Sequence, residues 1–405
     1  MSILSCSPLS PRVEEKGFPK GSPTFSALLG PLEACLPHLT PLASGSNKPL
    51  TYMFAHQIRG LVYYHTETCT SAQDLLLGAR CDGFVNRLLV PPSGLGESTF
   101  YEANASRGST QMIELVDRLS KQASQCVGLS YAELGHLVAI DGSLVAACLS
   151  MTWADYLGDV RKAKVHLGLD LSGSIPRKMI LTEGRGAERP FVFHLLKEGE
   201  TGILDRGYQD HQWFDAWIAE GKHFVVRLKK NTKWEVIEDL PFEKGTSTPT
   251  SIFLFSQVLL GDPVHRMTHP VYLVGFESRG KKYWIATHRE DLTAEQIAFI
   301  FSLRWQIEIF FAWWKKHLKV YHLISRNPHG LLVQLLCGLI TYLLLVIYFH
   351  QRYGQRPCVK CLRQLRWDIR HETQPPTLVH IYLVIQTDTQ FAPLIFLWLL
   401  NPAIF

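Results

Sequence analysis

The chain has 405 residues and a mass of 46.0 kDa, a length that predicts two or three domains. Apolar residues make up 46% and charged residues 19%, which excludes a disordered chain. The Gly, Cys and charge contents exclude collagen-like, disulfide-scaffold and coiled-coil classes. A formal net charge of +5 permits a polyanionic partner without requiring one. The nine cysteines are odd in number and scattered, which is typical of reduced thiols in a cytosolic protein.

The N-terminal part of the chain divides into two regions. Residues 1–50 hold eight of the 22 prolines and predict an irregular arm. Residues 51–128 have a helical pattern with breaks, in which Ser71 and Ser98 are candidate N-caps. Short helices separated by Gly and Pro turns fit a DNA-binding unit of the helix-turn-helix kind, and a small helical bundle fits them as well. We therefore expect a helical, DNA-binding region, with the bundle as the alternative.

Residues 129–235 have a different pattern, in which apolar runs alternate with turns. Three successive strand signals are followed by a strand, an amphipathic helix and a further strand, which indicates a mixed α/β sheet. The expected strands are residues 136–141, 163–171, 178–182, 201–205 and 222–228, and the expected helix is 210–219.

The remainder begins with a β-rich segment, expected over residues 236–284, whose strands are 251–259, 271–276 and 281–287. Residues 285–350 return to helix. Thr293 and Gln296 form a capping-box pattern that starts a helix ending near residue 319. Residues 331–349 carry no charge, so they are long and apolar enough either to span a membrane or to form a buried helix. Residues 351–405 show no clear pattern.

Three carboxylates are candidate ligands for a hard cation. Asp141 and Asp205 each end a predicted strand, where loops leave room for a ligand, although both also fit ordinary turns. Glu308 shares one face of its predicted helix with Arg304 and Lys315, because these positions differ by four and seven residues. Two metal ions held by such acids can stabilise both the attacking and the leaving oxygen of a phosphoryl transfer.

These residues together resemble the signature of bacterial DDE transposases of the insertion-sequence-four type. The matching motifs are Asp205-Arg206-Gly207-Tyr208, the Ala-Ile-Asp-Gly-Ser segment around Asp141, and the spacing of Arg304, Glu308 and Lys315. The order of the acids and the β-rich segment between the last two also match. The family's motif tyrosine falls on Phe301, which keeps the ring and loses the hydroxyl. The resemblance spans roughly residues 130–350.

The resemblance implies an α/β fold: a ribonuclease-H-like catalytic core with a β-rich insertion and a helical N-terminal DNA-binding region. It implies that Asp141, Asp205 and Glu308 are catalytic and ligate two Mg²⁺ ions, for which Mn²⁺ can substitute. Arg304 and Lys315 would hold phosphates, while Arg206 and Tyr208 would contact DNA or buttress the site. The expected activity is cleavage at the terminal inverted repeats of an insertion sequence and strand transfer into target DNA.

The resemblance further implies double-stranded DNA as partner, a homodimer in the synaptic complex, no membrane, and a cytoplasmic, nucleoid-associated bacterial protein. One alternative is a catalytically silent or domesticated transposase-derived DNA-binding protein, or a nuclease. Another, from a different class, is a membrane protein anchored by residues 331–349. The Cys358-Val-Lys-Cys361 segment is a lone pair without a second pair at zinc-site spacing, so idle thiols are the simpler interpretation.

Overall fold

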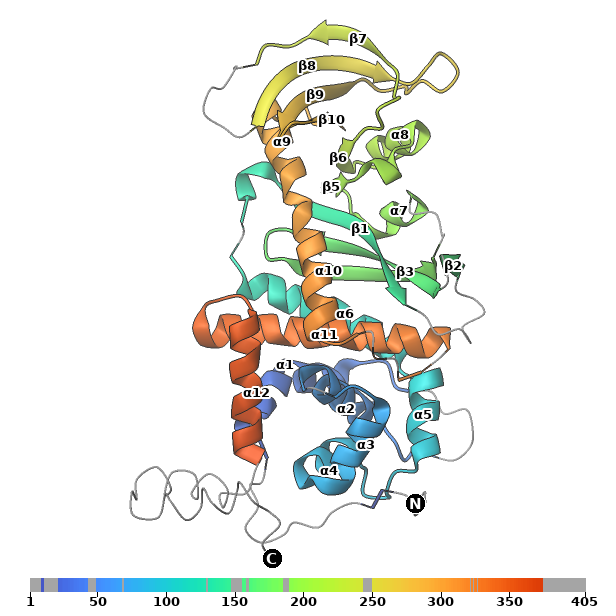
Figure 1. Ribbon diagram of the computed structural model, residues 1–405, viewed down its shortest axis with the longest axis vertical. Coiled ribbons are helices and arrows are strands. Elements are labelled where there is room, and N and C mark those ends of the chain that lie inside the picture. Colours follow the sequence, from blue (N-terminus) through green and yellow to red (C-terminus); the bar gives the residue numbers. More distant parts are fainter. Residues whose placement is uncertain are drawn as a thin grey trace, which may run out of the picture.

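The computed structural model describes residues 9–10, 21–42, 49–67, 69–128, 130–146, 155–157, 160–184, 189–242, 250–320, 322, 324–325 and 327–373. Its centre is one large mixed sheet with helices on both faces (Figure 1). A long helix runs beneath the sheet and separates it from a group of N-terminal helices (Figure 1). This mixed α/β architecture agrees with the class expected from the sequence.

Within the described residues, ten strands form the sheet, and their order is β2-β3-β1-β5-β6-β10-β9-β8-β7, with β4 paired to β3. Strands β1, β5 and β6 are parallel, whereas β3 and β10 run antiparallel to their neighbours. The bounds are β1 Leu137–Ala146, β2 Asp155–Leu157, β3 Val160–Asp170, β4 Ile175–Glu183, β5 Thr201–Leu204, β6 His223–Arg227, β7 Trp234–Asp239, β8 Thr250–Leu260, β9 Val271–Ser278 and β10 Lys281–Thr287.

The expected β-rich insertion continues the central sheet, because β10 pairs with β6 and β9, β8 and β7 follow outward. The outermost strand, β7, has no counterpart among the predicted strands. Most of its side chains are exposed, so it lacks the alternation of buried and exposed residues that marks a half-buried strand. Its acidic residues suit an edge strand, because charge discourages pairing with another chain.

Two apolar cores lie on the opposite faces of the sheet. The larger joins one face to the N-terminal helices and to the long helix α11, and the smaller packs α7 and α8 against the other face. The helices are α1 Pro23–Cys35, α2 Phe54–Thr66, α3 Ala72–Cys81, α4 Gly83–Leu89, α5 Glu97–Ser106, α6 Ser109–Cys126, α7 Val192–Leu195, α8 His211–Ala219, α9 Ala294–Leu303, α10 Trp305–His317, α11 Pro328–Tyr353 and α12 Val359–Thr373.

Helix α11 contains the uncharged segment noted in the sequence. By length and composition α11 could cross a membrane, as could the combined span of α9 and α10. In this structure every residue of α11 from Gly330 to Phe349 except Leu332 is buried. It packs against α6, α2, α5 and α1 (Figure 1). It is therefore the central helix of the larger core.

The terminal regions are more regular than the sequence predicts. Part of the expected arm forms α1, which tolerates Pro31 and buries Phe25 and Leu28 against the larger core. Ser71 caps α3 through a capping box, as expected. Ser98 is not an N-cap, because α5 begins one residue earlier and Gly96 is the residue before its first turn. Residues 359–373, which show no clear pattern in the sequence, form α12.

Candidate active site

The first two carboxylates lie at the carboxyl edge of the parallel strands. In the parallel pairing of β1 with β5, Ala139 lies opposite Ile203. Two residues further along each strand, this register brings Asp141 level with Asp205. Strand β6 continues the pattern, because Leu204 pairs with Val226 and the next residue in each strand is Asp205 or Arg227. The three side chains at this edge thus come from adjacent strands.

Asp141 lies on β1, level with the carboxyl ends of the parallel strands β5 and β6. Its Oδ1 accepts a hydrogen bond from the backbone N–H of Gly142 at 2.8 Å. Its Oδ2 lies 3.7 Å from Nη1 of Arg304, and its side chain is 24% exposed. The carboxylate is therefore ionisable, accessible and already faced by a cation.

Glu308 comes to the same place on α10. The predicted single helix is divided at Arg304, where the N–H of Arg304 bonds to Phe301 O and that of Ile307 to Arg304 O, a tighter spacing than in an α-helix. From this junction Nη2 of Arg304 donates to Oε1 of Glu308 at 2.6 Å. The guanidinium thus lies between the carboxylates of Asp141 and Glu308 and brings the first and third acids together.

Asp205 follows β5 and precedes the short 3-10 helix Arg206–Tyr208. Its Oδ1 is buried and accepts no hydrogen bond from the described residues. Nη1 of Arg227 lies 3.7 Å from that oxygen, beyond hydrogen-bonding distance. A buried carboxylate oxygen without a donor is costly unless a cation compensates it. The hard oxygen donors of Asp141, Asp205 and Glu308 fit a divalent cation of the Mg²⁺ type.

Within the described part of the chain, no three His, Cys, Asp or Glu side chains already form a cluster of the kind that holds a metal ion. At this site the Arg304 guanidinium, a cation itself, occupies the region between two of the acids. Metal binding by all three acids would therefore require Arg304 to shift toward a phosphate or to one side.

Lys315 extends the site along α10. Its Nζ donates to Ser143 Oγ at 2.5 Å and to the Leu144 carbonyl at 2.7 Å, just beyond Asp141 on β1. Burial lowers the Lys315 pKa to about 8, although the nearby Asp141 charge acts to raise it. A partly buried lysine beside the first carboxylate can hold a phosphate oxygen as a point charge.

The remaining two predicted contacts differ in exposure. Arg206 is exposed at the edge, next to Asp205. Tyr208 is only 1% exposed and its ring belongs to the smaller core, which favours the buttressing role over direct DNA contact. Phe301, at the position of the family's tyrosine, is also buried, and its ring lies 6.3 Å from that of Tyr283.

Sequence reasoning missed two residues at this edge. Arg227 ends β6 and faces Asp205, and its guanidinium also lies 4.9 Å from the centre of the Tyr283 ring. A single arginine at a strand end has no spacing that would single it out. Ser143 belongs to the motif around Asp141, but its role was not predicted: its hydroxyl accepts a hydrogen bond from Lys315.

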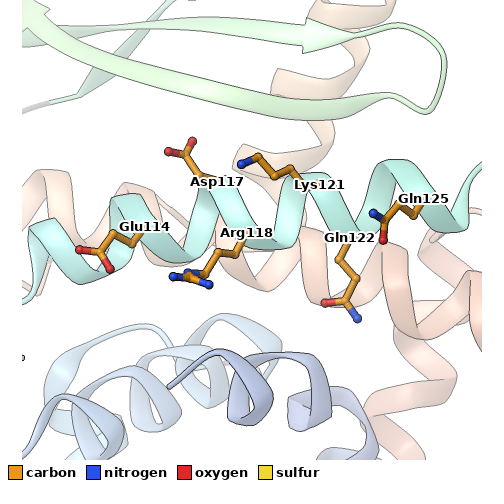
Figure 2. Close-up of a pocket in the computed structure, with 6 residues that line it drawn as sticks. All are labelled: Glu114, Asp117, Arg118, Lys121, Gln122 and Gln125. Carbon is orange, nitrogen blue, oxygen red and sulfur yellow. The ribbon is translucent and has the colours of Figure 1, made fainter. Parts of the chain in front are cut away.

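Two other features lie away from the carboxylates. A hollow along α6 is lined by Glu114, Asp117, Arg118, Lys121, Gln122 and Gln125. Figure 2 shows that these side chains come from one helix and point to both sides of it. Each side carries one acidic and one basic residue, so the hollow has no charge of a single sign. The Sγ atoms of Cys358 and Cys361 lie 2.7 Å apart at the start of α12.

Comparisons with known proteins bear on this site. A family model described as "Transposase DDE domain" matches residues 134–344, a span that contains Asp141, Asp205, Glu308 and Lys315. The chain is 28% identical over 252 residues to a putative transposase for insertion sequence element IS4SA of Synechocystis, covering 61% of this chain and 70% of that protein.

Two further relatives are similar to the same degree. A putative transposase, y4zB, of Sinorhizobium fredii is 27% identical over 315 residues, covering 74% of this chain and 86% of that protein. A probable transposase for insertion sequence element IS5377 of Geobacillus stearothermophilus is 27% identical over 206 residues, covering 51% of this chain and 54% of that protein.

Proposed function

Because this chain belongs to the DDE transposase family, whose domain spans more than half of its residues, we propose that it cuts the ends of an insertion sequence and joins them to target DNA. The observation that carries this proposal is the single guanidinium of Arg304, which faces Asp141 and donates to Glu308. It joins two acids that are far apart in the sequence, at the edge where Asp205 also lies.

Asp141, Asp205 and Glu308 would hold two Mg²⁺ ions, for which Mn²⁺ can substitute. When bound, such ions polarise phosphoryl oxygens and lower the pKa of water. Arg304 and Lys315 orient the scissile phosphate and balance the charge that develops on its oxygens. Arg206 adds a positive charge next to Asp205, and Tyr208 anchors the turn that follows Asp205 in the smaller core.

The proposed chemistry has two balanced steps. A water oxygen attacks the phosphorus at the element's end, and the bond from phosphorus to the 3′ oxygen breaks to leave a free 3′-hydroxyl. That hydroxyl then attacks a phosphodiester of the target, forming one new ester and releasing one target 3′-hydroxyl. Neither step forms a covalent bond between protein and DNA, so no Ser or Tyr nucleophile is needed.

The wider assembly extends the same proposal. The substrate is double-stranded DNA at terminal inverted repeats and at the target, bound by a homodimer that brings two ends together. We assign residues 51–128 to DNA binding, the catalytic core to residues 129–235 and 285–350, and the insertion to residues 236–284, in a cytoplasmic, nucleoid-associated protein. The exposed face of α5 carries Glu102 and no basic residue, so phosphate contacts in the N-terminal region would come from other helices.

The test begins with the DNA on each side of the coding region. Short imperfect inverted repeats flanked by a direct duplication would supply the substrate. The purified protein should then cut a linear duplex carrying one repeat, at the repeat's end, only when Mg²⁺ or Mn²⁺ is added. Binding to the repeat without cleavage by either metal would contradict catalysis and favour the silent alternative, for which the loss of the motif hydroxyl at Phe301 is the supporting observation.

We expect Lys315→Ala to lower the single-turnover cleavage rate by about 10²-fold, because it removes one preorganised charge at the phosphate. The matched control is Lys316→Ala, which removes the same charge from the exposed, neighbouring position of α10. At saturating protein concentration the cleavage rate of Lys315→Ala should still be lower than that of wild type, because the defect lies in the reaction and not in DNA binding. Equal effects of the two substitutions would show that charge on α10 in general, and not Lys315 in particular, is what matters.

A further inference from the structure

A basic loop joins β6 to β7 (Figure 1). Residues 228–233 read Leu-Lys-Lys-Asn-Thr-Lys, and Lys229, Lys230 and Lys233 are all exposed. The loop follows Arg227 directly, so it leaves the sheet at the same edge as Asp205. It holds no acidic residue, and the next one, Glu235, is paired with Arg266 at 2.7 Å.

The loop is fixed by one buried side chain, that of Gln209, which is 8% exposed and directly follows Tyr208. Oε1 of Gln209 accepts the backbone N–H of Lys229 at 2.7 Å, and its Nε2 donates to Thr232 Oγ1 at 2.9 Å. Thr232 Oγ1 in turn donates to the Lys229 carbonyl at 2.8 Å. The amide therefore closes a ring of hydrogen bonds around the turn that carries the lysines.

A second set of contacts holds the ends of the loop. The N–H of Leu228 donates to the Trp284 carbonyl at 2.8 Å, and the N–H of Gly261 donates to the Lys233 carbonyl at 2.8 Å. Long surface lysines on a mobile loop pay side-chain and backbone entropy when they bind. Because hydrogen bonds already fix the backbone of this loop, binding would not have to order it. An ordered loop favours a specific contact with one phosphate over a diffuse attraction to DNA.

We propose that residues 229–233 form a phosphate clamp for the DNA strand on the Asp205 side of the site, and that Gln209 is the positioning residue that holds it there. This inference rests on the proposed function and names a surface of that same site. The partner is the DNA backbone, because lysines on a loop present point charges without the planar geometry that reads a base edge. Lys315 and Arg304 lie on the other side of Asp205, so a DNA strand that crosses the three acids meets positive charge on both sides of them.

The lysines are tested by metal-free binding of the full-length protein to a duplex carrying the element's end, followed by fluorescence anisotropy across a range of salt. Each phosphate contact contributes about 0.9 to the slope of log affinity against log salt. We expect Lys230→Ala to reduce the slope by about one and to weaken binding about eight-fold at 0.1 M salt. Lys197→Ala is the control. Lys197 is exposed and precedes β5, so it lies at the amino end of the parallel strands, away from the candidate site.

The role of Gln209 is tested separately from charge. Thr232→Val removes the hydroxyl of the ring and keeps every lysine, whereas Thr232→Ser keeps the hydroxyl. We expect Thr232→Val and Gln209→Ala each to weaken DNA binding several-fold while the protein remains folded at the assay temperature. The two substitutions together should cost no more affinity than either alone, and Thr232→Ser should bind as wild type.

The outcomes are distinguishable. If the wild-type protein binds and cuts the element's end but Lys230→Ala and Thr232→Val match Lys197→Ala, the clamp is wrong and the proposed function stands. If the wild-type protein binds no element end, both are overturned. If Lys230→Ala loses affinity while Thr232→Val does not, the lysines bind DNA and the positioning role of Gln209 is wrong.

Discussion

Asp205→Asn is expected to reduce Mg²⁺-dependent strand cleavage by at least about 10³-fold, because several kcal/mol of transition-state stabilisation depend on its charge. The substitution keeps the shape of the side chain and removes the negative charge. It also replaces one of two acceptor oxygens by a donor. The buried Oδ1 of Asp205 accepts no hydrogen bond from the described residues and faces the Arg227 guanidinium at 3.7 Å, so its place in the structure suits a group that binds a cation. Asp141→Asn and Glu308→Gln should have effects of the same order.

The measurement is a single-turnover cleavage assay on a duplex that carries the element's end, together with binding in the absence of metal. Asp210→Asn is the matched control. Asp210 lies five residues away and caps α8 through its side chain, a role that asparagine fills equally well. If Asp205→Asn cleaved at the wild-type rate, the metal-ligand assignment would be wrong. If it lost DNA binding and thermal stability together, the residue would instead be structural.

Strands and helices in the catalytic region were predictable because local pattern and tertiary environment agree there. The strand that leads to Asp205 is fully buried, and the helix that leads into α10 begins with a capping box at Thr293. Strand β7 was not predictable, because it is an exposed edge whose pairing with β8 is set by the rest of the sheet. Helix α1 keeps Pro31 because packing against the core outweighs the lost backbone bond.

The candidate site shows the same division between local and tertiary information. The acids themselves could be selected from strand ends, helix spacing and a family signature. The link between them was predictable only in part: the i,i+4 spacing predicts the pair of Arg304 with Glu308, but nothing in the sequence predicts that the same guanidinium also faces Asp141. Arg227 and Gln209 were missed for a related reason, because each acts through neighbours on an adjacent strand or loop rather than through a motif.

The second large effect is on stability in acid, and two fully buried histidines contribute to it. His65 on α2 and His166 on β3 are both 0% exposed. Burial lowers the pKa of each from 6.5 to about 4, and the nearby Lys164 charge contributes at His166. Between pH 6.5 and pH 4 the unfolded chain therefore binds more protons than the folded one, so the free energy of unfolding falls as the pH is lowered. At pH 5 this amounts to roughly 2 kcal/mol per histidine.

A combined loss of about 4 kcal/mol is a large fraction of a typical folding free energy. We expect the urea midpoint of the wild-type protein to drop steeply between pH 7 and pH 5. His65→Asn keeps a donor near the Nδ1 position for the Leu318 carbonyl, and His166→Gln keeps a polar group near the Nε2 position for Thr182. The double variant should therefore lose about 4 kcal/mol less stability on acidification than wild type, whereas His265→Asn, at a 74% exposed side chain, should behave as wild type.

The position of His65 connects this effect to the candidate site. Its Nδ1 lies 2.6 Å from the carbonyl of Leu318, the residue that caps the carboxyl end of α10. Protonation of the buried ring would thus weaken the packing of the N-terminal helices against the helix that carries Glu308 and Lys315. In that case cleavage should fail at a higher pH in wild type than in His65→Asn, with both proteins still binding DNA. Parallel loss of stability in the wild type and the double variant would show that other groups govern acid unfolding.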